Sequence, residues 1–198
     1  EGHFLPNQDI LREQPNSANS VNLMYCLVNY IRTLSRIPCW MSNQAALPAL
    51  ATVLEVIQGP CEGNQEYLAL NTELIETLNR LLRVKAVNDC TEEDQVALKR
   101  VTIDIFQGLL EGQGHRVAVY ERVLAVIHLD IIMILCSPPE KTVVTIGETD
   151  DEKEEDGEED KEDDEDEIIL RTEFLVLLQM LCDFKPSLRD ELDMGKRM

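Results

Sequence analysis

Apolar residues recur at intervals of three and four through most of this chain, and the strict alternation that marks β-strands is rare. This spacing places the apolar side chains of a segment on one face of a helix, and that face must be covered by another surface. Short Gly and Pro stretches separate the helical segments, and no fixed-period repeat is present. The sequence therefore predicts an all-α fold, either an armadillo-like helical stack or an irregular helical bundle.

Caps and helix breakers place the individual helices. Ser20 is expected to cap the first helix, Pro48 suits the first turn of the second, and Thr91 followed by three acidic residues is typical of a capped helix start. The expected helices are residues 20–36, residues 47–58, one from Asn64, one from Asn71 or Thr72, one from Thr91 that Gly112 and Gly114 break, one from Val117 to the stop at Ser137-Pro138-Pro139, residues 168–182, and one capped by Ser187.

Negative charge is concentrated in one short segment. The 198 residues carry a net charge of −20, and residues 148–167 contain sixteen acidic residues against Lys153 and Lys161, a charge of −14 that leaves −6 for the rest. Such a segment buries too little apolar surface to order itself. The sequence predicts a helical domain over residues 1–146, a disordered acidic loop over 147–167, and continuing helices over 168–198, with the last one cut short. A partner rich in phosphates, such as nucleic acid, is not expected.

The acidic segment also resembles a calcium-binding loop in part. Glu152, Glu154, Asp156, Gly157 and Asp163 fall at loop positions 1, 3, 5, 6 and 12 of a calcium-binding hand. The loop lacks a glutamate at its last position and has no apolar helices beside it. A plain solvated linker is the favoured interpretation, with diffuse weak cation binding and a specific calcium hand as the alternatives.

The six cysteines stand singly and predict reduced core residues, which favours the cytosolic side of the cell. The chain opens without a secretory signal and without Met, so we expect a piece of a longer protein. Its longest apolar stretch, residues 123–135, is too short to span a bilayer, which takes about 20 apolar residues. No membrane contact by this segment is expected.

Residues that would carry catalysis do not cluster in the sequence. His3, His115 and His128 are scattered, so no zinc-binding pair of histidines is formed. The stretch Gly112-Gln113-Gly114 follows a predicted helix rather than a strand, which argues against a phosphate-binding loop. No serine lies in a nucleophile elbow. We therefore expect no enzyme activity, no cofactor and no metal site.

One motif between two predicted helices stands out. Gly59 and Pro60 are expected to end one helix, Gly63 to adopt a positive φ in a tight turn, and Asn64 to cap the next helix. The motif thus predicts a rigid corner. Its candidate site residues are Gln58, Gly59, Pro60, Cys61, Gly63, Asn64 and Gln65.

The run from Ile57 to Gln65 closely resembles a signature of inositol trisphosphate receptors and ryanodine receptors, where it lies in the RIH-associated domain. The earlier stretches Leu11-Arg12-Glu13-Gln14 and Asn19-Ser20-Val21-Asn22-Leu23 resemble the start of the same domain. The resemblance covers roughly residues 8–139.

This resemblance implies a helical module on the cytosolic face of a tetrameric calcium-release channel of the endoplasmic reticulum. The module would lie between the regulatory region and the pore, with other domains of the channel as its partners, and the motif would shape a helix junction, couple to gating, or do both. A free-standing cytosolic scaffold without a pore is the alternative.

Overall fold

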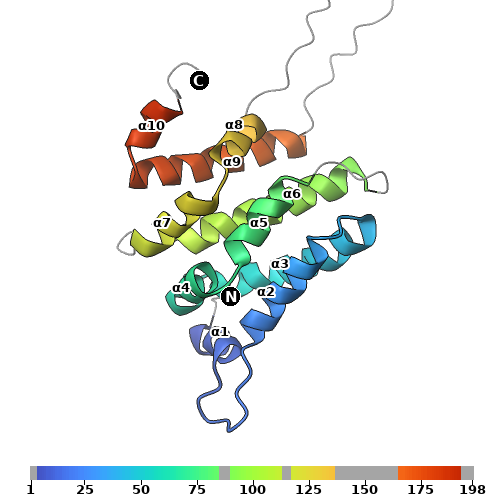
Figure 1. Ribbon diagram of the computed structural model, residues 1–198, viewed down its shortest axis with the longest axis vertical. Coiled ribbons are helices and arrows are strands. Elements are labelled where there is room, and N and C mark those ends of the chain that lie inside the picture. The colour runs from blue at the N-terminus through green and yellow to red at the C-terminus, as the bar shows by residue number, and fades with distance from the viewer. Residues whose placement is uncertain (1–3, 85–89, 113–116, 137–164, 193–198) are drawn as a thin grey trace, which may run out of the picture.

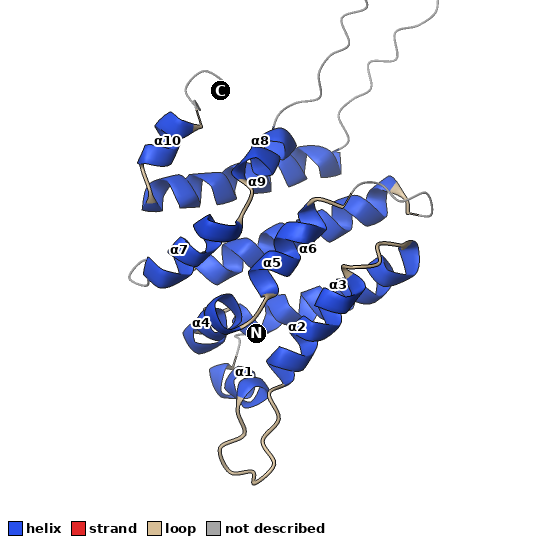
Figure 2. Cartoon of the chain, viewed as in Figure 1, coloured by secondary structure: helices blue, strands red, loops and turns tan. Residues whose placement is uncertain are grey.

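The structure, a computed structural model, describes residues 4–84, 90–112, 117–136 and 165–192. All regular secondary structure in these residues is α-helical, which confirms the all-α prediction (Figure 2). The helices are α1 (Leu5–Arg12), α2 (Leu23–Leu34), α3 (Trp40–Ile57), α4 (Glu62–Asn71), α5 (Leu74–Leu82), α6 (Glu92–Leu110), α7 (Val117–Val126), α8 (Leu129–Cys136), α9 (Glu165–Phe184) and α10 (Ser187–Glu191).

The helices form an irregular stack that follows chain order (Figure 1). Helices α1 to α4 occupy one end, α5, α6 and α7 the middle, and α8, α9 and α10 the other end. Helix α6 is central, because it packs against α3 on one side and α9 on the other and also contacts α4, α5 and α7. Helix α6 therefore connects the two ends of the stack directly, and α7 provides a second connection between α4 and α9.

One hydrophobic core runs through the whole stack. Leu50 of α3, Phe106 of α6 and Phe174 of α9 are fully buried members of the same cluster. Burial of each such side chain contributes about 1.5–3 kcal/mol. The first five helices consequently share a continuous core with the later ones.

Helix α6 begins and ends as the sequence predicts. The Thr91 hydroxyl accepts a hydrogen bond from Asp94 N at 3.1 Å, and the Asp94 carboxylate accepts one from Thr91 N at 3.3 Å. Gly112 has φ +69°, a conformation that glycine adopts without strain, and it ends the helix.

The predicted starts of α2 and α3 are wrong. Asn22, not Ser20, caps α2, since its Oδ1 accepts from Tyr25 N at 2.9 Å. Helix α3 begins at Trp40, where Cys39 and Ser42 form a reciprocal capping box, so Pro48 lies inside the helix rather than in its first turn. A cap supplied earlier in the chain thus outweighs the preference of proline for the first turn.

The helix expected from Val117 is divided into α7 and α8 at Ile127 and His128. His128 N donates to Oδ1 of Asn79, a residue of α5, at 3.1 Å. This tertiary acceptor replaces the carbonyl that a continuous helix would offer. The divided helix is therefore a consequence of packing against α5.

Helix α9 begins at Glu165, three residues before the expected start, and its first turn holds Glu165, Asp166 and Glu167. Acidic side chains are favourable there because the helix dipole is positive at its N-terminus. The rest of the acidic segment, with the candidate calcium-loop residues, lies outside the described residues, as do His3, His115 and Gly114.

All six cysteines are free thiols, with Cys61 and Cys182 buried and Cys26 exposed, so the prediction of a core position fails for Cys26. Within the described ranges no helix has the length and apolar character needed to cross a membrane.

Candidate functional site

The chain reverses between α3 and α4 at the predicted corner. Gln58 is the residue after α3 in extended backbone, and Gly59 follows with φ 100°. Cys61 then occupies the N-cap position of α4. Gly59 therefore provides the left-handed conformation that the turn requires.

Gly63 was expected to have the positive φ, and this prediction is wrong because Gly63 lies in the first turn of α4 with ordinary helical backbone. The absence of a side chain matters there for a different reason. A Cβ atom on Gly63 would lie 2.6 Å from Nη1 and 3.1 Å from Nη2 of Arg12. Gly63 thus leaves room for the Arg12 guanidinium over the start of α4.

Asn64 was expected to cap α4, and this is also wrong. Its side chain is fully buried, its Nδ2 donates to the carbonyls of Gln8 and Val56 at 3.0 Å each, and its Oδ1 accepts from Arg12 Nη1 at 2.6 Å. Asn64 faces the interior because it lies inside the first turn, three residues after the N-cap position. It thereby joins α4 to α1 and α3.

Gln65 makes the corresponding connection to α6. Its side chain is fully buried, and its Nε2 donates to the carbonyl of Gly108 at 2.6 Å and to that of Glu111 at 2.9 Å. Both carbonyls lie at the C-terminal end of α6, where backbone acceptors lack partners within the helix. Gln65 satisfies two of them.

A third amide side chain completes this arrangement. Gln8 of α1 is buried, and its Nε2 donates to the carbonyls of Glu55 and Gln58 at 2.7 and 2.9 Å, at the C-terminal end of α3. We name the three residues Gln8, Asn64 and Gln65 the amide clamp. The clamp caps the C-terminal ends of α3 and α6 by donating hydrogen bonds to their last carbonyls. Neither helix has a basic residue in its last turn that could do so.

The Cys61 thiol within the corner is buried and favours its protonated form. Cys61 is buried, and burial raises the pKa of its thiol, with a smaller contribution from nearby Asp9. Asp9 Oδ1 lies 3.9 Å from Cys61 Sγ and accepts from Arg12 Nη2 at 2.9 Å. Because the thiolate is the nucleophilic and metal-binding form, Cys61 is poorly suited to either chemistry. In the part of the chain that the structure describes, no cluster of His, Cys, Asp and Glu side chains could hold a metal ion.

The structure thus brings all seven predicted site residues into one junction. Asn64 and Gln65 are its buried polar centre, Gly63 leaves room for Arg12, and the turn consists of Gln58, Gly59, Pro60 and Cys61. Sequence reasoning missed Gln8 altogether and gave Arg12 no role in the site. A signal for the clamp was present in α4, where Asn64 and Gln65 share a face with the buried Leu68 and Ala69. Polar residues on a buried helix face require hydrogen-bond partners.

Residues 1–82 match the family model described as RyR and IP3R Homology associated. The chain matched no curated protein and no solved structure. The matched range ends at Leu82, the last residue of α5, and includes every residue of the corner and of the amide clamp. The expected resemblance is therefore confirmed up to residue 82, and residues 83–139 lie beyond the match. Over residues 1–82 this chain carries the sequence pattern of the RyR and IP3R Homology associated family.

Proposed function

We propose that this chain is a helical module of an intracellular ligand-gated calcium-release channel, and that it couples the regulatory region of the channel to the pore. The family match supports this proposal, because its description refers to both families of calcium-release channel. In the parent protein the module would lie on the cytosolic side of the endoplasmic reticulum membrane. Its partners would be other domains of the same channel, assembled as a homotetramer.

The amide clamp is the observation that carries the coupling role. Its three side chains donate six hydrogen bonds to backbone carbonyls, and they hold α1, α3, α4 and α6 at fixed positions. Deformation of the corner would break these donor contacts, and each buried carbonyl left without a partner costs about 1–3 kcal/mol. A module that transmits a displacement needs such a corner, since a soft corner would absorb the motion.

The proposal is tested in the intact parent protein by ligand-evoked calcium release from endoplasmic reticulum vesicles. Asn64→Leu breaks the clamp, and Arg12→Ala is a milder change at its more accessible end. Asn71→Leu, at an exposed position of the same helix, is the matched control. We expect the first two variants to reduce release while tetramer assembly persists, and the control to release calcium normally. Unchanged release in both Asn64→Leu and Arg12→Ala would contradict the coupling role.

A free-standing scaffold is the second candidate, and the exposed apolar side chains around α2 and the start of α3 favour it. Tyr25, Tyr30, Ile37, Trp40 and Met41 are each about half exposed or more. Such surfaces are typical of protein interaction sites. The complete coding sequence separates the candidates: several apolar spans beyond residue 198 support the channel, and a stop codon shortly after Met198 supports the scaffold.

A further inference from the structure

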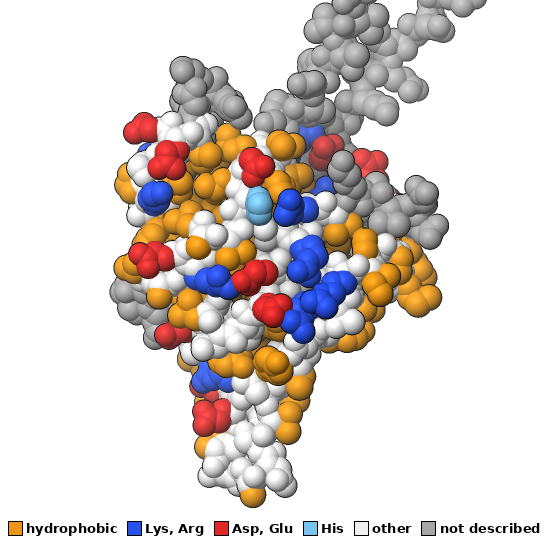
Figure 3. Space-filling model, viewed as in Figure 1, with side chains coloured by type: hydrophobic (Ala, Val, Ile, Leu, Met, Phe, Trp, Pro, Cys, Tyr) orange, Lys and Arg blue, Asp and Glu red, His pale blue; other side chains and the backbone are white. Residues whose placement is uncertain are grey.

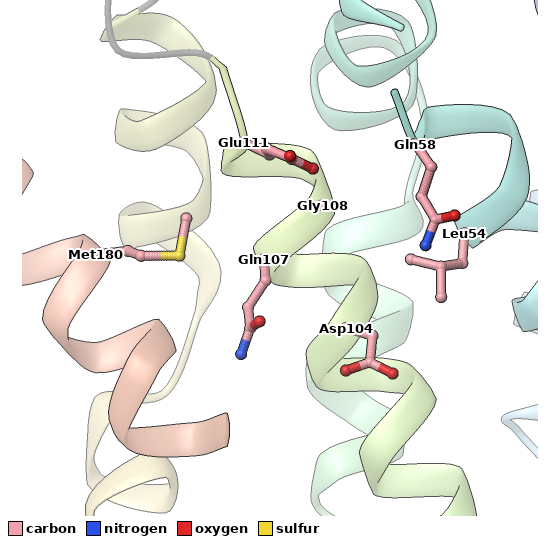
Figure 4. A pocket seen from close by; sticks show the side chains of 7 residues that line it. All are labelled: Leu54, Gln58, Asp104, Gln107, Gly108, Glu111 and Met180. Atoms are coloured by element: carbon pink, nitrogen blue, oxygen red, sulfur yellow. The ribbon is translucent and has the colours of Figure 1, made fainter. Parts of the chain in front are cut away.

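A groove of about 380 Å³ lies where α3, α6 and α9 meet, beside the corner (Figure 4). Helix α6 forms its floor, with α3 on one side and α9 on the other. Gly108 lets α3 pack closely on α6 here, because a Cβ atom on it would lie 3.0 Å from Cδ1 of Ile57. The lining residues are Leu54, Gln58, Asp104, Gln107, Gly108, Glu111 and Met180.

The groove is electrically negative. Its lining contains the carboxylates of Asp104 and Glu111 and no basic side chain. Gln58 and Glu111 are also the C-cap residues of α3 and α6, so the groove borders two helix C-termini, whose carbonyls Gln8 and Gln65 already bond. Neither helix has a basic residue in its last turn. A cation is therefore the complementary occupant.

Asp104 has too little positive charge around it. Burial and the neighbouring Glu173 of α9 raise the pKa of its carboxyl to about 6, against a smaller lowering by Arg100. Arg100 is shared among several acids, with its Nε 3.5 Å from Glu173 Oε1 and its Nη1 3.6 Å from Asp166 Oδ1. The single positive charge of Arg100 is thus shared among the carboxylates of Asp104, Asp166 and Glu173. An additional cation near Asp104 would relieve this imbalance.

The groove also has apolar walls. Leu54 of α3 and Met180 of α9 flank the strip of α6 that carries Asp104 and Glu111, and both are partly exposed (Figure 4). Lys and Arg combine an apolar stem with a charged head, and this combination matches a groove with apolar sides and acidic ends. The volume lies at the low end of the range for ligand pockets, about 300–1,000 Å³, which suits one or two side chains.

We propose that this groove is a docking site for a basic segment of another polypeptide. Arg or Lys side chains of this segment would enter between Leu54 and Met180 and place one charged head against Asp104 and another against Glu111. The docking site is independent of the proposed channel role, because a scaffold could use it equally. Since it borders the ends of α3 and α6 that the amide clamp closes, a docked segment would act directly on the corner.

The test uses the full chain with ¹³C-methyl-labelled methionine at physiological ionic strength. The probe is a short amidated peptide that carries two arginines one helical turn apart among alanines. We expect a saturable NMR shift of the Met180 methyl group. The double variant Asp104→Asn/Glu111→Gln should weaken the affinity at least about tenfold. The matched control Glu92→Gln/Glu93→Gln removes two exposed charges at the other end of α6 and should change affinity less than about twofold.

Peptide binding that leaves the Met180 methyl unshifted would overturn the proposal, since the acidic segment alone could attract arginine. An equal loss of affinity in the control would also overturn it, because the attraction would then depend only on net charge. Saturation by free N-acetylarginine amide at the same affinity would assign the groove to a small cation rather than to a polypeptide. Saturation of the groove double variant at the affinity of the natural chain would show that its carboxylates do not recognise the peptide.

Discussion

Arg12 Nη1 donates to Asn64 Oδ1 at 2.6 Å, and the two residues are 52 positions apart in the sequence. The same Asn64 amide donates to the carbonyl of Gln8 in α1 and to that of Val56 in α3. One buried side chain therefore joins three helices, and its removal leaves several polar groups without partners. This relationship gives the corner its rigidity.

Asn64→Leu should lower the free energy of unfolding by about 2–4 kcal/mol, because it strands two carbonyls at a buried site. Urea unfolding followed by circular dichroism measures this loss. Asn71→Leu, an exposed position in the same helix, should change stability by no more than about 0.5 kcal/mol. Equal stabilities for the two variants would show that the Asn64 contacts contribute nothing.

Gly59→Ala should destabilise the protein by about 1–3 kcal/mol, because Gly59 has φ 100° and an L side chain is strained there. Thermal unfolding by calorimetry measures the effect. An unchanged melting temperature would mean that the turn adopts another conformation in solution.

Gly63→Ala should behave differently, because its added Cβ meets only the movable end of the Arg12 side chain. In the natural chain the gain in helix propensity, about 1 kcal/mol, is offset by displacement of Arg12 from Asn64. In an Arg12→Ala background nothing is displaced, so the same change should stabilise by about 0.5–1 kcal/mol. A double-mutant cycle of unfolding free energies measures this coupling. Additive effects would refute the contact.

Asp104→Asn should stabilise the protein above pH 6. The ordinary pKa of 3.8 is raised to about 6 in the fold, so the folded state binds more protons between these values and stability falls as pH rises through them. The variant removes this cost. After allowance for partial exposure, the gain should be about 1 kcal/mol, or about 2–4 °C in melting temperature, at pH 7.5. It should vanish below about pH 4. A variant less stable than the natural chain at pH 7.5 would contradict the burial of an uncompensated carboxylate.

Local signals in the sequence were sufficient for much of the fold. The three- and four-residue spacing predicts the helices from α2 onwards but not α1, and the Thr91 and Asp94 pair forms the capping box that its sequence indicates. Gly59 and Pro60 end α3 at the expected position. In each case the interacting groups lie within a few residues of one another, so a single sequence contains the information.

The errors have their origin in contacts between distant segments. The break before α8 depends on Asn79, which is 49 positions from His128. The role of Gly63 depends on Arg12, and the role of Gln65 depends on carbonyls of α6. The groove needs three helices that are far apart in the chain. Spacing and composition alone do not reveal such partners.

Although the net charge of the chain is −20, basic side chains cluster on one part of the visible face. Figure 3 shows a group of basic side chains near the middle of the visible face. The hydrogen bond from Arg32 and the nearby charges of Arg36 and Arg80 lower the pKa of the Glu73 carboxyl. Arg32 Nη1 lies 2.7 Å from Glu73 Oε1. This exposed pair tethers α2 to the start of α5, and such pairs contribute little to stability in salt.

Native-state hydrogen exchange of the amides at the two helix ends tests the amide clamp most directly. Asn64→Leu should speed exchange in residues 54–58, at the end of α3, and leave residues 107–111, at the end of α6, close to their original rates. Gln65→Leu should do the reverse, because the Gln65 Nε2 donates to carbonyls at the end of α6. Exchange that is unchanged in both variants, or that accelerates equally at both ends, would contradict the clamp as the device that fixes this corner.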